Sequence, residues 1–575
     1  MSRGGRNGAG GRSPFGVPLD RRTALVNHVL DRLGLQEVFD HFVPTTDPRE
    51  KVPFAFTLGV LLRNMAVANK DALYAQADWA DRCVPALLGL TSEQMAAMGD
   101  DRIGRALDRL YQADRAALQT EVVLRAVRNF QVVLEELHND STSITFSGNY
   151  RNATGRPLWG RRAVHIANGF NKDHRPDLKQ MLWVLTVSAD GAVPVHYRVW
   201  DGNTADDRTH LDTWHTLTKV VGGPDFLYVA DCKLCNRATM RVIDTNGGRF
   251  LTVLPRNRAE DAWFRNWLQD HEPAWQEVSR SKPCGGSDGP EDVWRVFEAP
   301  VPSAEGYRIV WVWNSSKAVQ DADFRQRGIQ KASASLESLA HRLAGPRSRL
   351  RTREAVEKAV ADAVGQSATR WIKTQAQEVP QESSRKEGPG RPSPNSRYVR
   401  ETRMRWCLSW MVDVDKVKAD ARSDGMFPLI TNDRGLDPGD ALGKYKYQPF
   451  LEKRHQQLKT VHHVTPVCLK NEGRIEALLL LHFMGLLIHS LLERALRQAM
   501  VKADVGQLPL SPEERSCHAP TADRVLSLFA DVQFHYLYQK GILLKVFGPQ
   551  LTELQGQVLD LLEISSNQFV PTWSR

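Results

Sequence analysis

Hydrophobic and polar positions follow a helical period over residues 20–130. Stretches such as "RRTALVNHVLDRLG" and "DDRIGRALDRLYQ" place apolar residues three and four positions apart, which is the spacing of one helix face. From about residue 131 the apolar residues gather in short runs such as "SITFSG" and "DFLYVAD", which are typical of strands. The pattern therefore predicts a helical N-terminal domain over residues 20–130, followed by a mixed α/β region.

Residues 131–256 carry the clearest strand signals. Two apolar runs flank the pair Asp190-Gly191, a dipeptide favoured in hairpin turns. Further along, the strand-like run Phe226–Asp231, the helical segment Asn236–Thr245 and the strand-like run Phe250–Leu254 predict a βαβ unit. We interpret this region as the first part of an α/β core.

The core pattern then stops and later resumes. Residues 257–400 contain Trp-rich, strand-like pieces and then an Arg-rich helical stretch. They end in "QESSRKEGPGRPSPNSR", a composition that predicts a flexible linker. Residues 401–500 return to strand and then helix pattern, and 501–575 are predicted to be a C-terminal helical region. The sequence thus predicts an α/β core interrupted by an insertion domain before its last helix.

Composition narrows the class of protein. The 575 residues are 42% hydrophobic and 25% charged, as in soluble globular proteins, and a net charge of +9 favours a polyanionic partner such as nucleic acid. The most apolar run, Ala477–Leu492, is shorter than the roughly 20 residues that cross a bilayer, so it predicts a core helix and no membrane partner. Residues 1–19 predict a disordered basic tail without a secretory leader, and the scattered cysteines indicate the cytoplasm.

Three acids stand out by position. Asp140 follows an apolar run, and Asp231 closes a strand, where ligand crevices form in open α/β sheets. Glu452 shares one face of a predicted helix with His455 and Lys459. Each acid alone has an ordinary interpretation as a turn cap or a solvated helix face. Three carboxylates brought together would need a cation, and Mg²⁺ prefers such oxygen ligands.

A spaced signature surrounds the third acid. Tyr445, Gln448, Glu452 and Lys459 match the pattern Y-x-x-R-x-x-x-E-x-x-x-x-x-x-K in every spacing, with Gln in place of Arg. The stretches "HNDSTSITFSGNY", "DGNTAD", "VADCKLCN", "FPLITND" and "CLKNEGRIEALLLLHFMGLLIHSLLER" agree with it. On these residues the chain resembles the DDE transposases of bacterial insertion sequences, over most of residues 20–570.

The resemblance implies a fold and a set of site residues. It implies an RNase H-like catalytic core that carries an insertion domain between its fifth strand and its final catalytic helix. The catalytic acids, which would hold two Mg²⁺ with Mn²⁺ as an alternative ion, are Asp140, Asp231 and Glu452. The residues that would contact DNA phosphates near them are Tyr445, Gln448 and Lys459. A Gln at the Arg position can hydrogen-bond a phosphate but cannot neutralise it.

The implied function is DNA transposition. Such an enzyme binds terminal inverted repeats, cleaves the element ends by metal-dependent hydrolysis and joins the 3′-OH ends to target DNA, working as a homodimer on double-stranded DNA. Two alternatives remain open: a catalytically inactive, transposase-derived DNA-binding protein, and an RNase H-like structure-selective nuclease, which cuts without joining. The three acids argue against the inactive form, whereas Gln448 and "CKLC" keep it open. The helical N-terminal domain would bind transposon ends or dimerise.

Weaker signals allow a structural and a functional interpretation. An arginine cluster could neutralise DNA phosphates or cover a solvated helix end; its members are Arg347, Arg349, Arg351 and Arg353. Cys232 and Cys235 form a C-x-x-C pair, but zinc needs four ligands, so buried thiols are favoured. "GPGRPSPNSR" shares Gly-Arg-Pro with minor-groove AT-hook peptides, although a plain linker is favoured. Trp200 could stack on a displaced base or simply be buried.

Overall fold

The structure is a computed structural model with a mixed α/β fold. It describes residues 19–20, 22–45, 50–67, 76–80, 83, 85–281, 291–345, 348–464, 467, 469–511, 513, 515–539, 542–548 and 550–566. The chain forms two compact units. Unit 1 comprises residues 1–252 and 444–575, and unit 2 comprises residues 253–443.

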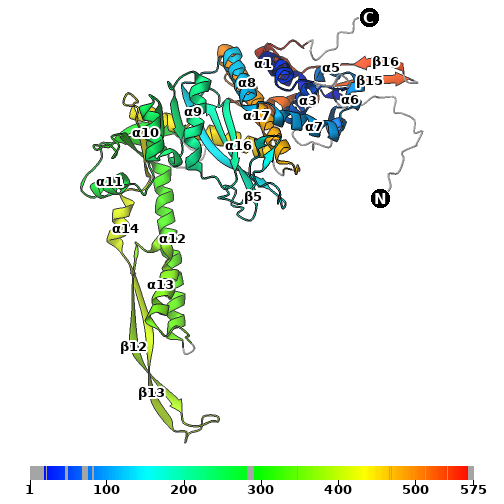
Figure 1. Cartoon of the computed structure of the whole chain (residues 1–575). Helices are drawn as coiled ribbons and strands as arrows, with labels where there is room; N and C mark the ends of the chain where they lie inside the picture. The colour runs from blue at the N-terminus through cyan, green and yellow to red at the C-terminus, as the bar shows by residue number, and fades with distance from the viewer. Residues whose placement is uncertain are drawn as a thin grey trace. The chain divides into compact units, whose positions relative to one another are not determined.

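Helices fill most of the described N-terminal part of unit 1 and surround one long apolar helix (Figure 1). The N-terminal helices are α1 (Thr23–Leu33), α2 (Leu35–Phe42), α3 (Phe54–Val67), α4 (Gln76–Ala80), α5 (Pro85–Leu88), α6 (Ser92–Ala96), α7 (Asp100–Gln112) and α8 (Arg115–Phe130). Four of them, α1, α3, α7 and α8, contact α17 (Glu472–Lys502). By length and composition α17 could cross a membrane, but its most apolar stretch is completely buried within the protein. The prediction of a buried core helix is therefore confirmed.

Five neighbouring strands of a β-sheet form the centre of unit 1. These strands, in spatial order, are β6 (Pro194–Asp201), β5 (Lys179–Ser188), β2 (Glu136–Phe146), β7 (Leu227–Ala230) and β8 (Arg249–Val253). The β6–β5 and β5–β2 pairs are antiparallel, and the β2–β7 and β7–β8 pairs are parallel. Parallel neighbours need a crossover, which α9 (Thr209–Val221) and α10 (Arg237–Thr245) provide. The predicted βαβ unit is thus confirmed as β7–α10–β8.

The β5–β6 hairpin turns at the predicted pair Asp190-Gly191. Gly191 has φ of +83°, a left-handed conformation that glycine adopts without strain. A Cβ there would also lie only 3.1 Å from the side chain of Arg494, so the turn and this arginine are closely packed. Arg494 Nε donates to Asp190 Oδ1 at 2.8 Å. The hairpin signal is confirmed, and α17 holds the turn from one side.

Helix α16 (Gln448–Thr460) is fixed to the same turn. The buried guanidinium of Arg454 donates from Nε to the carbonyl oxygen of Ala192 and from Nη2 to that of Gly191, each at 3.0 Å. Nη2 also lies 2.8 Å from Glu493 Oε2 on α17, and both side chains are less than one-tenth exposed. Arg454 therefore joins α16, α17 and the β5–β6 turn.

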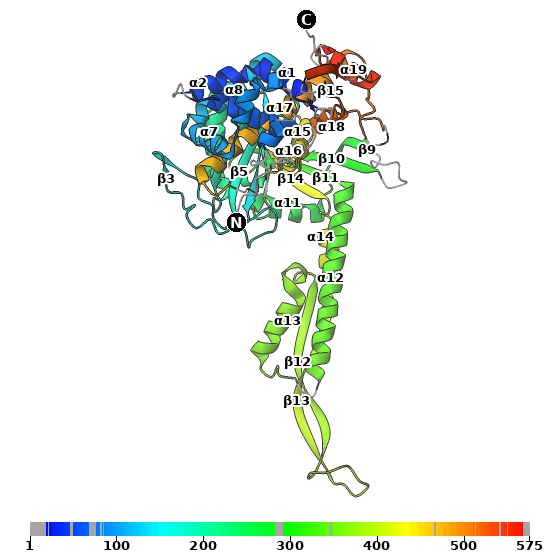
Figure 2. The ribbon, with the colours of Figure 1, turned by 90° about the vertical axis from the view of Figure 1, so that its right-hand side faces the viewer.

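Unit 2 contains an antiparallel sheet and a long two-stranded ribbon. The sheet strands, in spatial order, are β14 (Met426–Thr431), β11 (Arg308–Asn314), β10 (Asp292–Glu298) and β9 (Gln276–Ser281). Helix α11 (Ala259–Asp270) packs on this sheet, with the ring of Phe264 stacked 3.9 Å from that of Trp311. The remaining elements are α12 (Ser315–Ala344), α13 (Arg353–Ala368), the ribbon strands β12 (Ile372–Lys386) and β13 (Tyr398–Val412), and α14 (Val414–Ala421) (Figure 2).

The structure differs from the sequence-based boundaries in three places. Residues 401–443, predicted to rejoin the core, belong to unit 2, and most of the predicted flexible linker lies in the ribbon and its turn. The predicted helical C-terminal region contains α18 (Ala522–Leu528) and α19 (Glu553–Leu561), but also the strands β15 (Gln533–Gln539) and β16 (Ile542–Phe547). Strand β15 pairs with the two-residue strand β1 (Leu19–Asp20). The predicted basic tail otherwise lies outside the described residues.

Replacing Arg454 with Met should destabilise unit 1 strongly. The apolar side chain would leave the buried Glu493 carboxylate without its main partner, which costs about 3–5 kcal/mol in the free energy of unfolding. Guanidinium chloride denaturation measures this difference. The matched control is Arg105→Met, which removes an exposed ion pair with Asp101 and should cost less than about 1 kcal/mol. An equally small loss in Arg454→Met would contradict the role given to this guanidinium.

Candidate active site

The first two predicted acids lie next to each other on neighbouring parallel strands. The β2–β7 register pairs Asn139 with Ala230, so the following residues, Asp140 and Asp231, occupy adjacent positions at the carboxyl end of β7. Paired strands are about 4.8 Å apart, and residues in register point to the same face. Asp140 lies on β2, the middle strand of the five. The sheet itself therefore brings two carboxylates together that are separated by 91 residues of sequence.

The electrostatics agree with this placement. Burial raises the pKa of Asp140 above its usual value, although the neighbouring Lys172 ammonium opposes the rise. Burial and, next in size, the negative charge of Asp140 raise the pKa of Asp231. Each carboxylate is thus in an environment that disfavours its charge. Such a pair is stabilised by a nearby cation.

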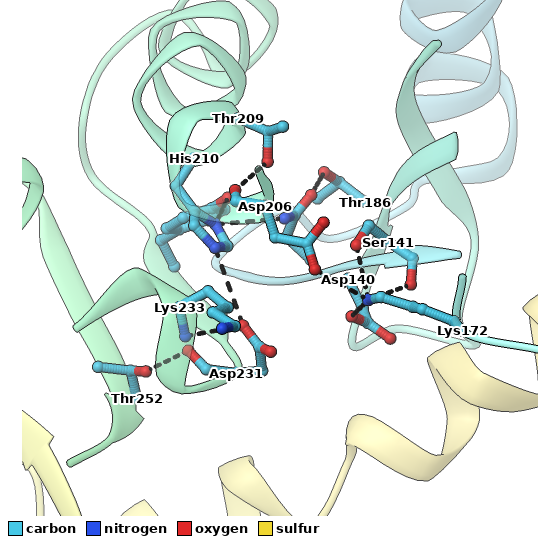
Figure 3. A network of polar contacts seen from close by, with 12 residues as sticks. Asp140, Ser141, Lys172, Thr186, Asp206, Thr209, His210, Asp231, Lys233 and Thr252 are labelled. Carbon is cyan, nitrogen blue, oxygen red and sulfur yellow. Dashed lines mark hydrogen bonds and ion pairs between the residues drawn. The ribbon is translucent and has the colours of Figure 1, made fainter. Parts of the chain in front are cut away.

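Lys172 supplies positive charge at this point in the structure (Figure 3). Its ammonium lies 3.4 Å from Asp140 Oδ1 and 3.3 Å from Asp206 Oδ2, and it donates to the carbonyl and hydroxyl oxygens of Ser141, each at 2.7 Å. Asp206, the last residue of "DGNTAD", begins the 3-10 turn η2 (Asp206–Arg208) shortly after β6. Asp206 is therefore a third carboxylate of this cluster.

His210 on α9 borders the second acid. Its Nε2 lies 3.9 Å from Asp231 Oδ1, while its Nδ1 lies 3.2 Å from the Tyr228 hydroxyl. Burial lowers the pKa of His210, so the ring is mainly neutral near pH 7. Asp231 itself accepts a hydrogen bond from the Lys233 backbone N–H at 3.0 Å, and Thr252 donates to its carbonyl oxygen at 2.6 Å. These contacts fix the end of β7.

Helix α16 presents one face to β2. His455 Nε2 lies 3.9 Å from Asp140 Oδ2, and burial lowers the pKa of His455 to about 3, so this ring is neutral. Glu452, one turn earlier, is exposed, and Lys459, one turn later, pairs with Asp173 at 2.6 Å. The three residues share a face as predicted, and the contact of His455 with Asp140 directs that face toward the first acid.

Tyr445 connects the third acid to the other two. It ends α15 (Pro438–Tyr445), three residues before Gln448 begins α16. Its pKa is raised to about 12, by burial first and then by the negative charges of Asp231, Glu452 and Asp140, among others. The negative charges of all three predicted acids thus act in the same direction on this phenol, in addition to its burial. The side-chain oxygen of Gln448 is buried and accepts no hydrogen bond from the described residues.

The side chains at this site have oxygen atoms of the kind that a hard divalent cation prefers as ligands. Carboxylate oxygens are the ligands that Mg²⁺ prefers, and the raised pKa values of Asp140 and Asp231 show that both would gain from a bound cation. The spacing of these side chains fits a metal ion less well. Among the described residues, no group of three or more His, Cys, Asp or Glu side chains lies close enough together to hold a metal ion.

The residues that carry the weaker sequence signals lie at these places in the structure. Arg349 and Arg351 are exposed between α12 and α13 in unit 2. Arg353 is exposed at the first position of α13, where it pairs with Glu357 at 2.8 Å, and Arg347 lies outside the described residues. Cys232 and Cys235 are half-buried, and burial together with Asp231 raises the pKa of Cys232, so its thiol stays protonated near pH 7. Trp200 is half-buried, with the Arg198 guanidinium 4.3 Å from its ring.

Sequence reasoning missed Lys172, Asp206 and His210. Lys172 lies in a loop stretch, "FNKDHRPD", without periodicity or a turn signature. Asp206 is the last residue of "DGNTAD", a stretch that agrees with the family signature but contains none of the three predicted acids. An acid directly after a predicted strand and turn, on the same sheet edge as Asp140 and Asp231, is the signal that could have identified it.

The chain is similar to one domain family and to several solved structures. The domain of unknown function DUF4277 matches residues 21–124. No curated protein matches the chain. A cryo-EM structure of the piggyBac transposase synaptic complex with hairpin DNA is similar at 10% identity and TM-score 0.33, covering 98% of this chain and 86% of that one. A Mos1 transposase paired-end complex with left transposon end is similar at 13% identity and TM-score 0.14, and the match covers 36% of this chain and 60% of that one. TM-scores below 0.5 do not establish a shared fold, so the evidence on function comes from the chain's own residues.

Proposed function

We propose that this chain is a DDE-type DNA transposase with an RNase H-like core. The observation that carries the proposal is the pair Asp140 and Asp231, in register on parallel strands at the carboxyl end of β7. The order β6-β5-β2-β7-β8 and the interruption of unit 1 by residues 253–443 agree with such a core and its insertion. The signature Tyr445, Gln448, Glu452 and Lys459 supports the same family.

In this proposal the chain's own residues prepare a site for phosphodiester chemistry. Asp140, Asp231 and Glu452 would hold Mg²⁺, which when bound activates a water or 3′-OH nucleophile and stabilises the leaving oxygen. The neutral rings of His210 and His455 border the acids without adding charge. Lys459 and the phenol of Tyr445, which keeps its proton because its pKa is about 12, would contact phosphates of the DNA strand.

One observation favours a second candidate, an inactive DNA-binding protein derived from a transposase. Lys172 neutralises Asp140 and Asp206 directly, so the chain already provides a cation where a metal would be needed. An internal lysine of this kind can either be displaced on metal binding or replace the metal permanently. The two candidates differ in whether DNA is cut.

Asp231→Asn should abolish nicking and joining while leaving DNA binding intact. The amide cannot replace a charged metal ligand, so we expect the cleavage rate to fall at least about 100-fold. The assay uses purified protein, Mg²⁺ and a plasmid carrying the flanking element ends, scored for nicked and joined products. Fluorescence anisotropy with labelled end DNA measures binding.

Asp225→Asn is the matched control. Asp225 precedes β7, is almost completely exposed and pairs with Arg249 at 3.2 Å, so the same exchange there should leave cleavage unchanged. Wild-type nicking by Asp231→Asn would rule out the metal assignment. Nicking without joining in the wild-type chain would favour the nuclease, and binding without either reaction would favour the inactive protein.

Lys172→Met should lower the free energy of unfolding by about 1–3 kcal/mol, because Asp140 and Asp206 lose their shared cation. The loss should be smaller in an Asp140→Asn background, giving a coupling energy of about 1 kcal/mol in a double-mutant cycle. Urea denaturation provides all four values. Lys219→Met, at an exposed position on α9, should change stability by less than about 0.5 kcal/mol. Zero coupling would show that the ammonium does not stabilise Asp140.

A further inference from the structure

The ribbon of unit 2 is longer than the helices that support it. Strands β12 and β13 are each 15 residues long and pair without a register shift from Ile372↔Val412 to Lys386↔Tyr398. At about 3.4 Å per residue the ribbon extends about 50 Å. It continues past the ends of α12 and α13, as both views show (Figures 1 and 2).

Only the proximal half of the ribbon has a hydrophobic core. There, Ile372 and Leu408 are buried in a cluster with residues of α12 and α13, and Trp406 packs against it. Beyond Trp406, the side chains of Val379 and Met404 are 44% and 56% exposed, so no packed face continues outward. An isolated two-stranded ribbon is only marginally stable in water, so the distal half would gain from a partner that covers it.

The charge of the distal half indicates the kind of partner. Residues 379–405 contain seven Lys or Arg and three Asp or Glu. Two of the acids are already paired with arginines of the same ribbon, since Glu401 lies 2.9 Å from Arg403 and Glu382 lies 3.8 Å from Arg400. Three other exposed arginines, which within the described part of the chain have no carboxylate partner, are Arg385, Arg391 and Arg397. The excess of positive charge fits a polyanion.

The positive charges lie on both faces of the ribbon and at its end. Cross-strand pairs share a face and alternate along the strand, so Arg385 and Arg403 lie on one face and Arg400 on the other. Arg391 and Arg397 lie in the connecting turn. The Lys386 ammonium donates to the carbonyl oxygens of Gly390 and Arg391 at 2.9 and 3.0 Å, which ties this turn to the strand ends.

We propose that the distal ribbon, residues 379–405, is a DNA-binding arm that enters the major groove of duplex DNA. The major groove is about 12 Å wide and admits a two-stranded β-ribbon, and guanidiniums on both faces can reach the phosphates on its two walls. The assignment of DNA rather than another polyanion rests on the proposed function. A second copy of this chain, pairing through the exposed strand edges, is the competing occupant.

The test removes the three arginines that have no carboxylate partner. The full chain carrying Arg385→Gln, Arg391→Gln and Arg397→Gln is compared with wild type for binding to a labelled duplex of about 30 base pairs, by fluorescence anisotropy over a salt series. We expect binding about tenfold weaker or more at about 0.1 M salt, and a salt slope smaller by about 2 to 3, because three phosphate contacts are lost. The control removes three exposed charges from α12 and α13 of the same unit, by Arg327→Gln, Arg342→Gln and Lys358→Gln, and should weaken binding less than about twofold.

Each possible result of this binding test either supports or overturns the proposal. Unchanged duplex binding by the ribbon variant, or an equal loss in the control, overturns the proposal. A change in mass by light scattering without a change in DNA affinity assigns the ribbon to contacts between chains and also overturns it. Since binding is measured without cleavage, failure of the transposase assignment would appear separately, as the absence of joined products in the assay of the wild-type chain. Circular dichroism of the variants checks that each chain is folded.

Discussion

The repulsion between the Asp140 and Asp231 carboxylates is the constraint around which the site in unit 1 is organised. The β2–β7 register places them side by side, and partial burial raises the pKa of both carboxyl groups. Two features of the surrounding residues affect this repulsion. Lys172 contributes positive charge, and burial lowers the pKa of the nearby His210 and His455. A site that carries this much negative charge at the end of parallel strands is suited to bind a cation.

The rigidity of the surrounding elements matters as much as the charges. Two of the acids are fixed by a sheet, whereas Glu452 depends on the placement of α16. That helix is held by Arg454, whose guanidinium reaches the backbone of the β5–β6 turn and the carboxylate of Glu493. The β5–β6 turn requires Gly191 to adopt a left-handed backbone conformation. A hairpin on one side of the sheet thus determines where the third acid lies relative to the first.

Periodicity and turn chemistry in the sequence were enough to predict the elements that carry the site. The strand before Asp231, the helix bearing Glu452 and the Asp190-Gly191 turn depend on local signals, and the structure contains each of them. Lys172 and Asp206 could not be predicted in the same way, because their roles arise from contacts between loops far apart in sequence. The distal part of the ribbon has the composition of a linker because it buries little apolar surface. Its strands are held mainly by cross-strand hydrogen bonds between backbone groups, which composition does not reveal.

The central claim is that Asp140, Asp231 and Glu452 serve one cation site. Electron paramagnetic resonance of Mn²⁺ tests it most directly, because the free ion gives a strong signal that broadens when protein carboxylates bind it. In a titration of the full chain with duplex DNA present, the account predicts saturable Mn²⁺ binding that is lost in Asp140→Asn and weakened in Glu452→Gln. The same bound signal in wild type and both variants would contradict it.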